Sequence, residues 1–134
     1  MKKLSFLIIA IVICNTINAQ IQLGRTENEI KAIYPQRTWR VSYDSKQTRY
    51  IYADFEYGLF SYYFDKTTGR CNLCAQIPHT NLTMNVQIQI YNDKYVVTSK
   101  TSWTAYLDNG SIVLISLIYD EDTKTSFFRY ELGN

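Results

Sequence analysis

Apolar and polar residues alternate with a period of two along much of the chain, as they do in half-buried β-strands. From position 49 to 57 one face carries Ile51, Ala53, Phe55 and Tyr57, and the other carries Tyr50, Tyr52, Asp54 and Glu56. Gly58 then turns the chain, and positions 59–65 alternate in the same way. The two runs predict an antiparallel hairpin with one apolar face and one tyrosine-rich face.

Turn residues separate further predicted strands. Lys66 to Gly69 form a hairpin loop that precedes a strand at 70–77. Asn109-Gly110 is typical of a two-residue hairpin turn and separates strands at 103–108 and 112–119. Ile112 to Ile115 has no polar partner face, which predicts a central strand covered on both sides. A last strand at 126–132 follows the acidic turn Asp120-Glu121-Asp122.

A short helix is predicted at the start of the domain. Thr26-Glu27-Asn28-Glu29 fits the capping box, in which the threonine and glutamate satisfy each other's free backbone N–H groups. Ile30, Ile33 and Tyr34 fall on one helical face, and Pro35 ends the helix. Two turns are not stable alone, so this face must pack on a sheet.

The stretch at 82–95 fits either a strand or a helix. Met84, Ile88 and Tyr91 lie on one helical face, although the alternation of positions 84–90 also suits a strand. Shifting the chain by 57 residues superposes Thr26 on Thr83 and Tyr34 on Tyr91. This shift suggests tandem repeats at 23–77 and 80–134 and favours the helix. The predicted fold class is α+β, with short helices packed on one face of an antiparallel sheet.

The opening Leu23-Gly24-Arg25-Thr26-Glu27-Asn28-Glu29-Ile30, followed by Tyr34-Pro35 and a meander of aromatic strands, resembles a family of exported α+β modules. That family is related to β-lactamase inhibitor protein and to the small lipoprotein of the outer-membrane assembly machinery. The resemblance implies a protein-binding module that presents its open sheet face. The chain departs from the family in lacking a lipobox and the disulfides of the inhibitor.

The N-terminus has the parts of a secretory signal peptide: Lys2 and Lys3, an apolar run from Leu4 to Cys14, and a polar region up to Ala19. The run is too short to span a bilayer, which takes roughly 20 apolar residues. Cleavage after Ala19 would leave a single domain at 20–134. Ile13 disfavours lipidation of Cys14, so we expect an exported protein, periplasmic or secreted.

Charge and composition narrow the function classes. Without Lys2 and Lys3, 12 basic residues remain against 12 acidic ones, and this neutrality argues against capture of nucleic acid or of an anionic membrane. The 12 tyrosines are far too many for a disordered chain. No cofactor motif is present, and the oligomeric state stays open.

Cys71-Asn72-Leu73-Cys74 is the sharpest motif, and in an exported protein it suggests a thiol–disulfide redox site. Such a site needs a helix N-terminus, whereas this motif lies in a predicted strand. There the two cysteines would point to opposite faces with Cα atoms about 10 Å apart, beyond the roughly 7 Å that a disulfide tolerates. We expect two unpaired thiols, at least one of them in the core.

Metal sites are not expected. His79 follows Cys74 at a spacing found in zinc knuckles, but Met84 occupies the position of the fourth ligand. Asp120-Glu121-Asp122 lacks the glycine and the later glutamate of a calcium loop. His79 is also the only histidine, which disfavours a catalytic triad.

The leading hypothesis is therefore a non-enzymatic module that binds a protein partner through an open sheet face. The predicted binding residues are Tyr50, Tyr52, Asp54, Glu56 and Tyr63, because tyrosine offers a large apolar area with a polar tip. An ordinary solvated sheet face would show the same residues. Two other functions stay open: a redox protein that uses Cys71 and Cys74, and a small-ligand or glycan binder that uses the tyrosines.

Overall fold

The computed structural model describes residues 21–133, so the predicted signal peptide and Cys14 lie outside the described residues. Within them the fold is α+β and mostly sheet, with eight antiparallel strands and two helices. In chain order the elements are α2 (Glu27–Ile33), β1 (Arg40–Tyr43), β2 (Arg49–Phe55), β3 (Gly58–Phe64), β4 (Cys71–Pro78), α3 (Asn81–Lys94), β5 (Val96–Ser99), β6 (Ser102–Tyr106), β7 (Ile112–Asp120) and β8 (Thr125–Leu132). Neither described helix is long and apolar enough to span a membrane.

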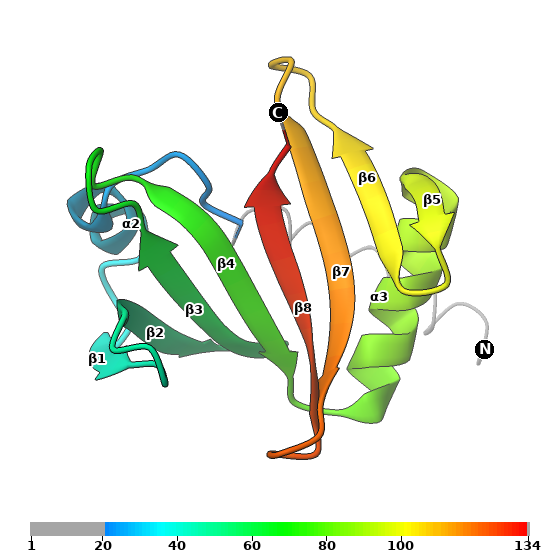
Figure 1. Cartoon of the computed structure of the whole chain (residues 1–134), viewed down its shortest axis with the longest axis horizontal. Coiled ribbons are helices and arrows are strands. Elements are labelled where there is room, and N and C mark those ends of the chain that lie inside the picture. The colour runs from blue at the N-terminus through cyan, green and yellow to red at the C-terminus, as the bar shows by residue number, and fades with distance from the viewer. Residues whose placement is uncertain (1–20, 134) are drawn as a thin grey trace.

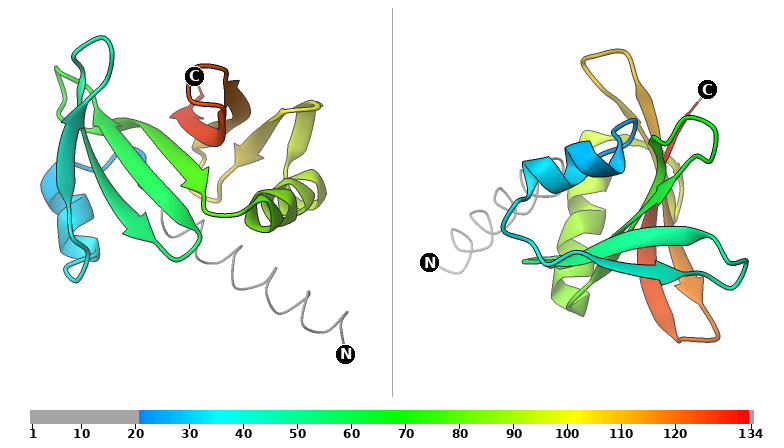
Figure 2. Two further views of the ribbon diagram at one scale, coloured as in Figure 1. Left: turned by 90° about the horizontal axis from the view of Figure 1, so that it is seen from below. Right: turned by 90° about the vertical axis from the view of Figure 1, so that its left-hand side faces the viewer.

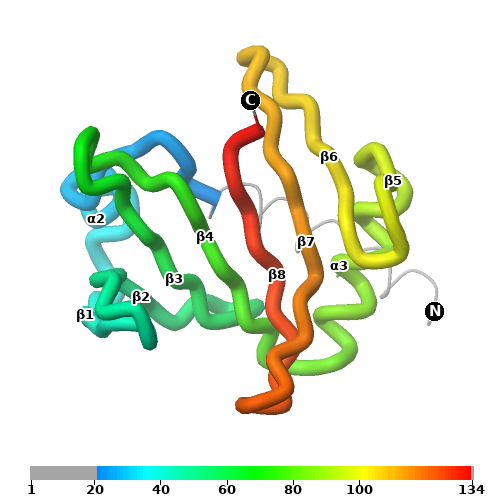
Figure 3. Tube along the Cα trace, in the orientation of Figure 1, coloured from blue at the N-terminus to red at the C-terminus, as the bar shows by residue number. Residues whose placement is uncertain are grey.

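The eight strands form one sheet in the order β1-β2-β3-β4-β8-β7-β6-β5. Figure 1 and the trace in Figure 3 show β4 beside β8 in the middle and β1 and β5 at the two edges. Each half of the chain is a helix followed by a four-stranded meander, and the halves meet where β4 pairs with β8. The helix caps Thr26 and Thr80 lie 54 residues apart, as do the first residues of β4 and β8. The element order therefore repeats at an offset of 54, not at the 57 of the sequence comparison.

The capping box of α2 forms as predicted. The Thr26 hydroxyl accepts a hydrogen bond from the Glu29 backbone N–H, and Glu29 Oε2 accepts one from the Thr26 N–H. Ile30 is fully buried, but Ile33 is 41% exposed, so its predicted place on the buried face is wrong. Ile33 is the last residue of the helix, and it belongs neither to the buried cluster nor to the residues packed against it.

The ambiguous stretch is a helix, as the repeat pattern favoured. Thr80 caps α3 by accepting a hydrogen bond from the Thr83 N–H. Tyr91 is buried and makes edge-to-face contacts with Trp103 and Phe128, at centroid distances of 5.6 and 5.5 Å. Aromatic contacts of this kind join α3 to strands of the second half.

The predicted β2–β3 hairpin forms with small differences at its turn. Ile51, Ala53 and Phe55 are buried, as the alternation predicted. The turn lies at Glu56 and Tyr57, and Gly58 is already the first residue of β3. Both residues therefore leave the strand faces on which the period of two had placed them.

Two predictions for the second half need correction. The Asn109-Gly110 connection is longer than a two-residue turn, because Leu107 N–H donates to Ser111 O and Gly110 N–H to Leu107 O. Gly110 supplies the positive φ of 85° that this loop requires. Strand β7 lies inside the sheet, but Leu114 is 42% exposed, so β7 is not covered on both sides.

Candidate functional site

The structure brings the three predicted tyrosines together. The register places Tyr50 opposite Tyr63 and Tyr52 opposite Ser61. The rings of Tyr50 and Tyr63 stack at a centroid distance of 4.8 Å, and Tyr50 and Tyr52 lie 6.0 Å apart. All three tyrosines are half-buried, on the side of the sheet opposite Ile51 and Ala53.

The surroundings of Tyr63 change the acidity of its hydroxyl group. Burial raises the pKa of its hydroxyl to about 12, and Tyr50 and Asp44 add to this effect. Tyr63 is therefore neutral at physiological pH and acts as a hydrogen-bonding aromatic group. It offers a partner apolar ring area and a polar tip, with no charge.

The two predicted acidic residues lie in different surroundings. The Asp54 side chain is exposed on β2, and its Oδ1 lies 2.8 Å from His79 Nε2. The same nitrogen lies 3.0 Å from Phe55 O, and because both oxygens are acceptors, Nε2 carries the proton. Glu56 lies in the β2–β3 turn, which removes it from the strand face on which it was predicted.

The tyrosine face continues across the whole sheet. We call the side opposite the buried positions the outer face. Successive register pairs join one row of outer-face residues that runs from β1 to β5: Ser42, Tyr50, Tyr63, Leu73, Glu131, Leu114, Thr104 and Val96. Leu114 is 42% and Val96 is 53% exposed. The row is mostly apolar and uses residues from both halves of the chain.

A second row on the outer face carries mostly short side chains. It runs beside the first and consists of Arg40, Tyr52, Ser61, Ala75, Arg129, Ser116, Ser102 and Ser99. Near its centre, Arg129 Nε lies 3.0 Å from Glu131 Oε1 of the apolar row. The outer face thus combines apolar side chains with an ion pair at its middle.

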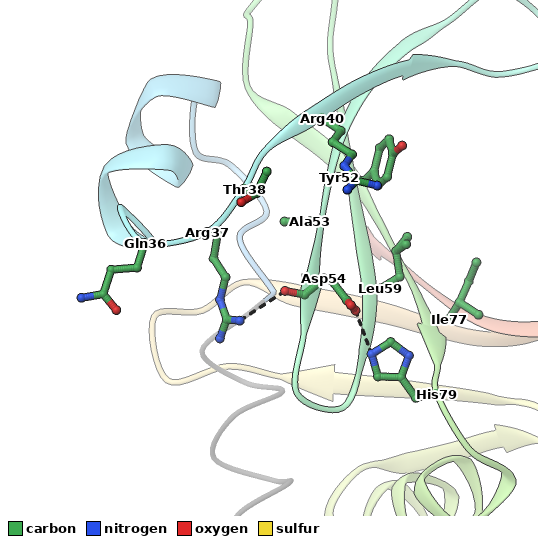
Figure 4. A pocket seen from close by; sticks show the side chains of 10 residues that line it. All are labelled: Gln36, Arg37, Thr38, Arg40, Tyr52, Ala53, Asp54, Leu59, Ile77 and His79. Atoms are coloured by element: carbon green, nitrogen blue, oxygen red, sulfur yellow. Dashed lines mark hydrogen bonds and ion pairs between the residues drawn. The ribbon is translucent and has the colours of Figure 1, made fainter.

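Two hollows are lined in part by residues of this face. One, of about 490 Å³, lies between the β1–β2 turn and the centre of the sheet and is lined in part by Lys46, Tyr63 and Phe127. The other, of about 620 Å³, lies beside Tyr52 and Asp54 and is shown in Figure 4. The residues around it that sequence reasoning did not assign to a site are Gln36, Arg37, Thr38, Arg40, Leu59, Ile77 and His79. Only Leu59 and Ile77 could have been found, by extending the strand alternation.

The cysteine pair lies in β4 in an unexpected arrangement. Tyr63 pairs with Leu73 but Phe64 pairs with Cys71, so Asn72 is an extra residue in the strand and forms a bulge. The bulge reverses the alternation, and both Cys71 and Cys74 are buried, which contradicts the prediction of opposite faces. The two thiols are unpaired in the structure.

The surroundings of the thiols oppose reactivity. Burial raises the pKa of the Cys71 thiol to about 12 and that of Cys74 well above its usual value. A reactive cysteine needs the opposite shift, since the thiolate is the nucleophile.

Among residues 21–133, no three His, Cys, Asp or Glu side chains are arranged to hold a metal ion. The turn at 120–122 is held by Asp120 Oδ1, which accepts hydrogen bonds from the backbone N–H groups of Asp122 and Thr123.

No known family model matches the chain, and no curated protein or solved structure matches it either. The resemblance to inhibitor-like modules stays a prediction that rests on residues 23–35 and on the element order. The arguments about function below therefore use only the geometry and chemistry of the described residues.

Proposed function

We propose that the chain is an exported, non-enzymatic binding module that engages a protein partner through its outer face. The observation that carries this proposal is the apolar row that crosses all eight strands. Five of its eight residues are apolar or aromatic, and apolar groups gathered on one exposed face favour an interaction role. Tyr50 and Tyr63 lie near one end of the row, and Leu114 lies near the other.

The position of the helices supports the proposal. Ile30 of α2 and Tyr91 of α3 belong to the same buried cluster as Phe60 and Phe128 of the sheet. In the right-hand view of Figure 2, α2 and α3 both lie to the left of β7 and β8. We infer that both helices pack on the inner face of the sheet and leave the outer face for a partner.

The residue types on the outer face suit a protein partner. Tyrosine is enriched at interfaces because it gives large contact area with few rotatable bonds. The Arg129–Glu131 ion pair and Asp54 would contribute to partner selectivity more than to affinity. A redox function is less well supported, because the buried thiols have raised pKa values.

The test is a Tyr52→Ala, Tyr63→Ala variant in the chain that starts at Gln20. We expect binding to a partner captured from the native compartment to weaken roughly a hundredfold, because each lost anchor costs more than about 1 kcal/mol. The free energy of unfolding should fall by only about 1 to 2 kcal/mol.

The proposed export has its own test. N-terminal sequencing of the exported protein should find Gln20 as the first residue, and a lipid attached to Cys14 would contradict the proposed soluble form.

The matched control is a Tyr43→Ala, Tyr119→Ala variant. Both tyrosines are 58% exposed and neither belongs to the two rows of the outer face. The control should bind the partner as the unchanged protein does. Equal binding by all three proteins would contradict the proposal, and a large fall in melting temperature of the Tyr52/Tyr63 variant would place these side chains in the core.

A further inference from the structure

The hollow beside Tyr52 has an apolar floor and a basic rim. Tyr52, Leu59 and Ile77 come from three neighbouring strands of the outer face, and Ile77 is 39% exposed. Arg37 and Arg40 approach from the segment between α2 and the start of β1 (Figure 4). We call this site the Arg37/Arg40 groove.

The positive charge of Arg37 is positioned but not neutralised. Its Nη1 donates to Asp54 O at 3.2 Å, and its Cζ lies 4.6 Å from the centre of the Phe55 ring. A carbonyl oxygen and an aromatic face orient a guanidinium without cancelling its charge. A guanidinium held in this way keeps most of its donors available for a carboxylate.

Arg40 adds a second cation at the same rim. It lies opposite Tyr52 in the register and is exposed at the start of β1. The ion pairs found between residues 21 and 133 involve neither Arg37 nor Arg40. Two guanidinium groups without a carboxylate partner in the described part of the chain therefore lie at one groove.

Asp54 is the acidic residue that lines this groove, and His79 already engages it. The Asp54 carboxylate lies 2.8 Å from His79 Nε2, on the side of Asp54 away from Arg37 (Figure 4). Arg37 contacts the backbone oxygen of Asp54 and leaves its carboxylate to His79. The groove is thus locally basic, although the chain from position 20 onward is neutral overall.

We infer that the Arg37/Arg40 groove binds an acidic segment of the partner protein, in which an aspartate or glutamate lies next to a large apolar residue. This inference rests on the proposed function and names the partner chemistry. The acidic side chain pairs with Arg37 or Arg40, whose planar groups match a carboxylate. The neighbouring apolar side chain packs on Leu59 and Ile77. The site therefore requires an acidic and an apolar side chain next to each other in the partner.

The test uses a display library of random eight-residue peptides, selected on the immobilised chain from Gln20 to Asn134. The same selection is run on an Arg37→Gln, Arg40→Gln variant. The charge-matched control is a Lys66→Gln, Lys100→Gln variant, since both lysines are exposed and line neither the groove nor the two rows. Glutamine keeps a polar, hydrogen-bonding side chain while it removes the charge, and it shortens the side chain in both variants.

The unchanged protein and the control should enrich peptides with an acidic residue beside a leucine, isoleucine or phenylalanine. The affinity of a synthesised winning peptide should fall at least tenfold in the arginine variant and less than threefold in the control. Replacing the acidic residue of this peptide by its amide should weaken binding to the unchanged protein by the same factor as the arginine substitutions do. The same replacement should have little further effect on binding to the arginine variant. Binding should also weaken as salt rises.

Several results would overturn the inference: no enriched peptide, enrichment without acidic residues, or equal affinity for the arginine variant. An oligonucleotide of the same length that binds more tightly than the winning peptide would assign the arginines to phosphate recognition instead. The proposed function fails separately, because it depends on Tyr52 and Tyr63. If those substitutions abolish partner binding and the arginine substitutions do not, the outer face is an interface without an acidic determinant.

Discussion

The side-chain amides of Gln76 and Gln87 hydrogen-bond to each other twice in the interior of the protein. Gln87 Nε2 donates to Gln76 Oε1 at 2.7 Å, and Gln76 Nε2 donates to Gln87 Oε1 at 3.0 Å. Both residues are 0% exposed. Since Gln76 belongs to β4 and Gln87 to α3, this pair links the two halves of the chain.

Two tyrosines complete the network and fix its proton positions. Tyr130 O–H donates to Gln76 Oε1 at 2.9 Å, so the Tyr91 hydroxyl, 2.8 Å from that of Tyr130, must be the donor between the two rings. The second Gln76 N–H reaches Tyr57 O at 3.3 Å. The Gln76 amide therefore uses both donors and both acceptor positions, as a buried polar group requires.

A Gln87→Leu substitution should lower the free energy of unfolding by about 1 to 3 kcal/mol, because it leaves buried groups of Gln76 without partners. The Gln76→Leu, Gln87→Leu double variant should lose less than the sum of the two single losses. Urea denaturation of all three proteins measures this coupling. Gln89→Leu, at an exposed position of α3, is the control and should change stability little. Strict additivity would contradict the network.

Gly58 should tolerate no side chain. A Cβ atom there would lie 2.6 Å from Ile77 O and 3.1 Å from Gln76 Cγ, because β3 and β4 approach closely at this point. Gly58→Ala should cost about 1 to 3 kcal/mol by overpacking and should also disturb the Gln76 amide. Gly69→Ala is the comparison, with open space but a φ of 68°, at a cost of about 1 kcal/mol. Thermal unfolding should rank Gly58→Ala as the less stable variant.

Glu27 should give a pH-dependent contribution to stability. Hydrogen bonds from Arg49, together with Lys31, lower the pKa of its carboxyl from 4.5 to about 2, although burial opposes them. Because the pKa is depressed in the folded state, the contribution is complete above pH 4.5 and disappears as the pH falls through 2. Both cations are partly exposed, so its size is about 1 kcal/mol.

The measurement is the difference in unfolding free energy between the unchanged protein and Glu27→Gln. This difference should be constant between pH 5 and 7 and should shrink towards pH 2. Glu121→Gln, at an exposed position in the β7–β8 turn, is the control and should show no such trend. A difference that stays constant down to pH 2 would show that the Arg49 pairing does not stabilise the fold.

The thiols of Cys71 and Cys74 should react only when the protein unfolds. Burial holds the pKa of Cys71 at about 12, so little thiolate exists at pH 8. The chain from Gln20 should show almost no reaction with a disulfide reagent when folded and two reactive thiols in denaturant. A Ser45→Cys variant supplies an exposed thiol in the β1–β2 turn as the positive control. A protein lighter by two hydrogens would instead indicate a disulfide.

The local patterns of the sequence predicted much of the fold because they depend on near neighbours. Alternation placed Ile51 and Phe55 on the buried face, and the Thr26–Glu29 capping box located the start of α2. The face of Tyr50, Tyr52 and Tyr63 followed from the same period of two. These features need no knowledge of which strands pair.

Features that depend on strand pairing could not be read from the sequence. The bulge at Asn72 exists because β3 and β4 change register, and it moved Cys71 to the buried face. Leu114 belongs to an apolar run that resembles a fully covered strand, yet no spacing rule reveals that its side of the sheet is exposed. Arg37 and His79 approach Asp54 from segments 17 and 25 residues away along the chain.

The pairing of β4 with β8 has a consequence for the order in which the protein is made. Strand β8, the last to be synthesised, fills the centre of the sheet, and until it arrives β4 is an unpaired edge. The first half then presents free backbone groups and an incomplete Gln76 network, which is a hazard for wrong pairing between nascent chains. Losing β8, residues Thr125–Leu132, would split the sheet in two rather than shorten it at one end.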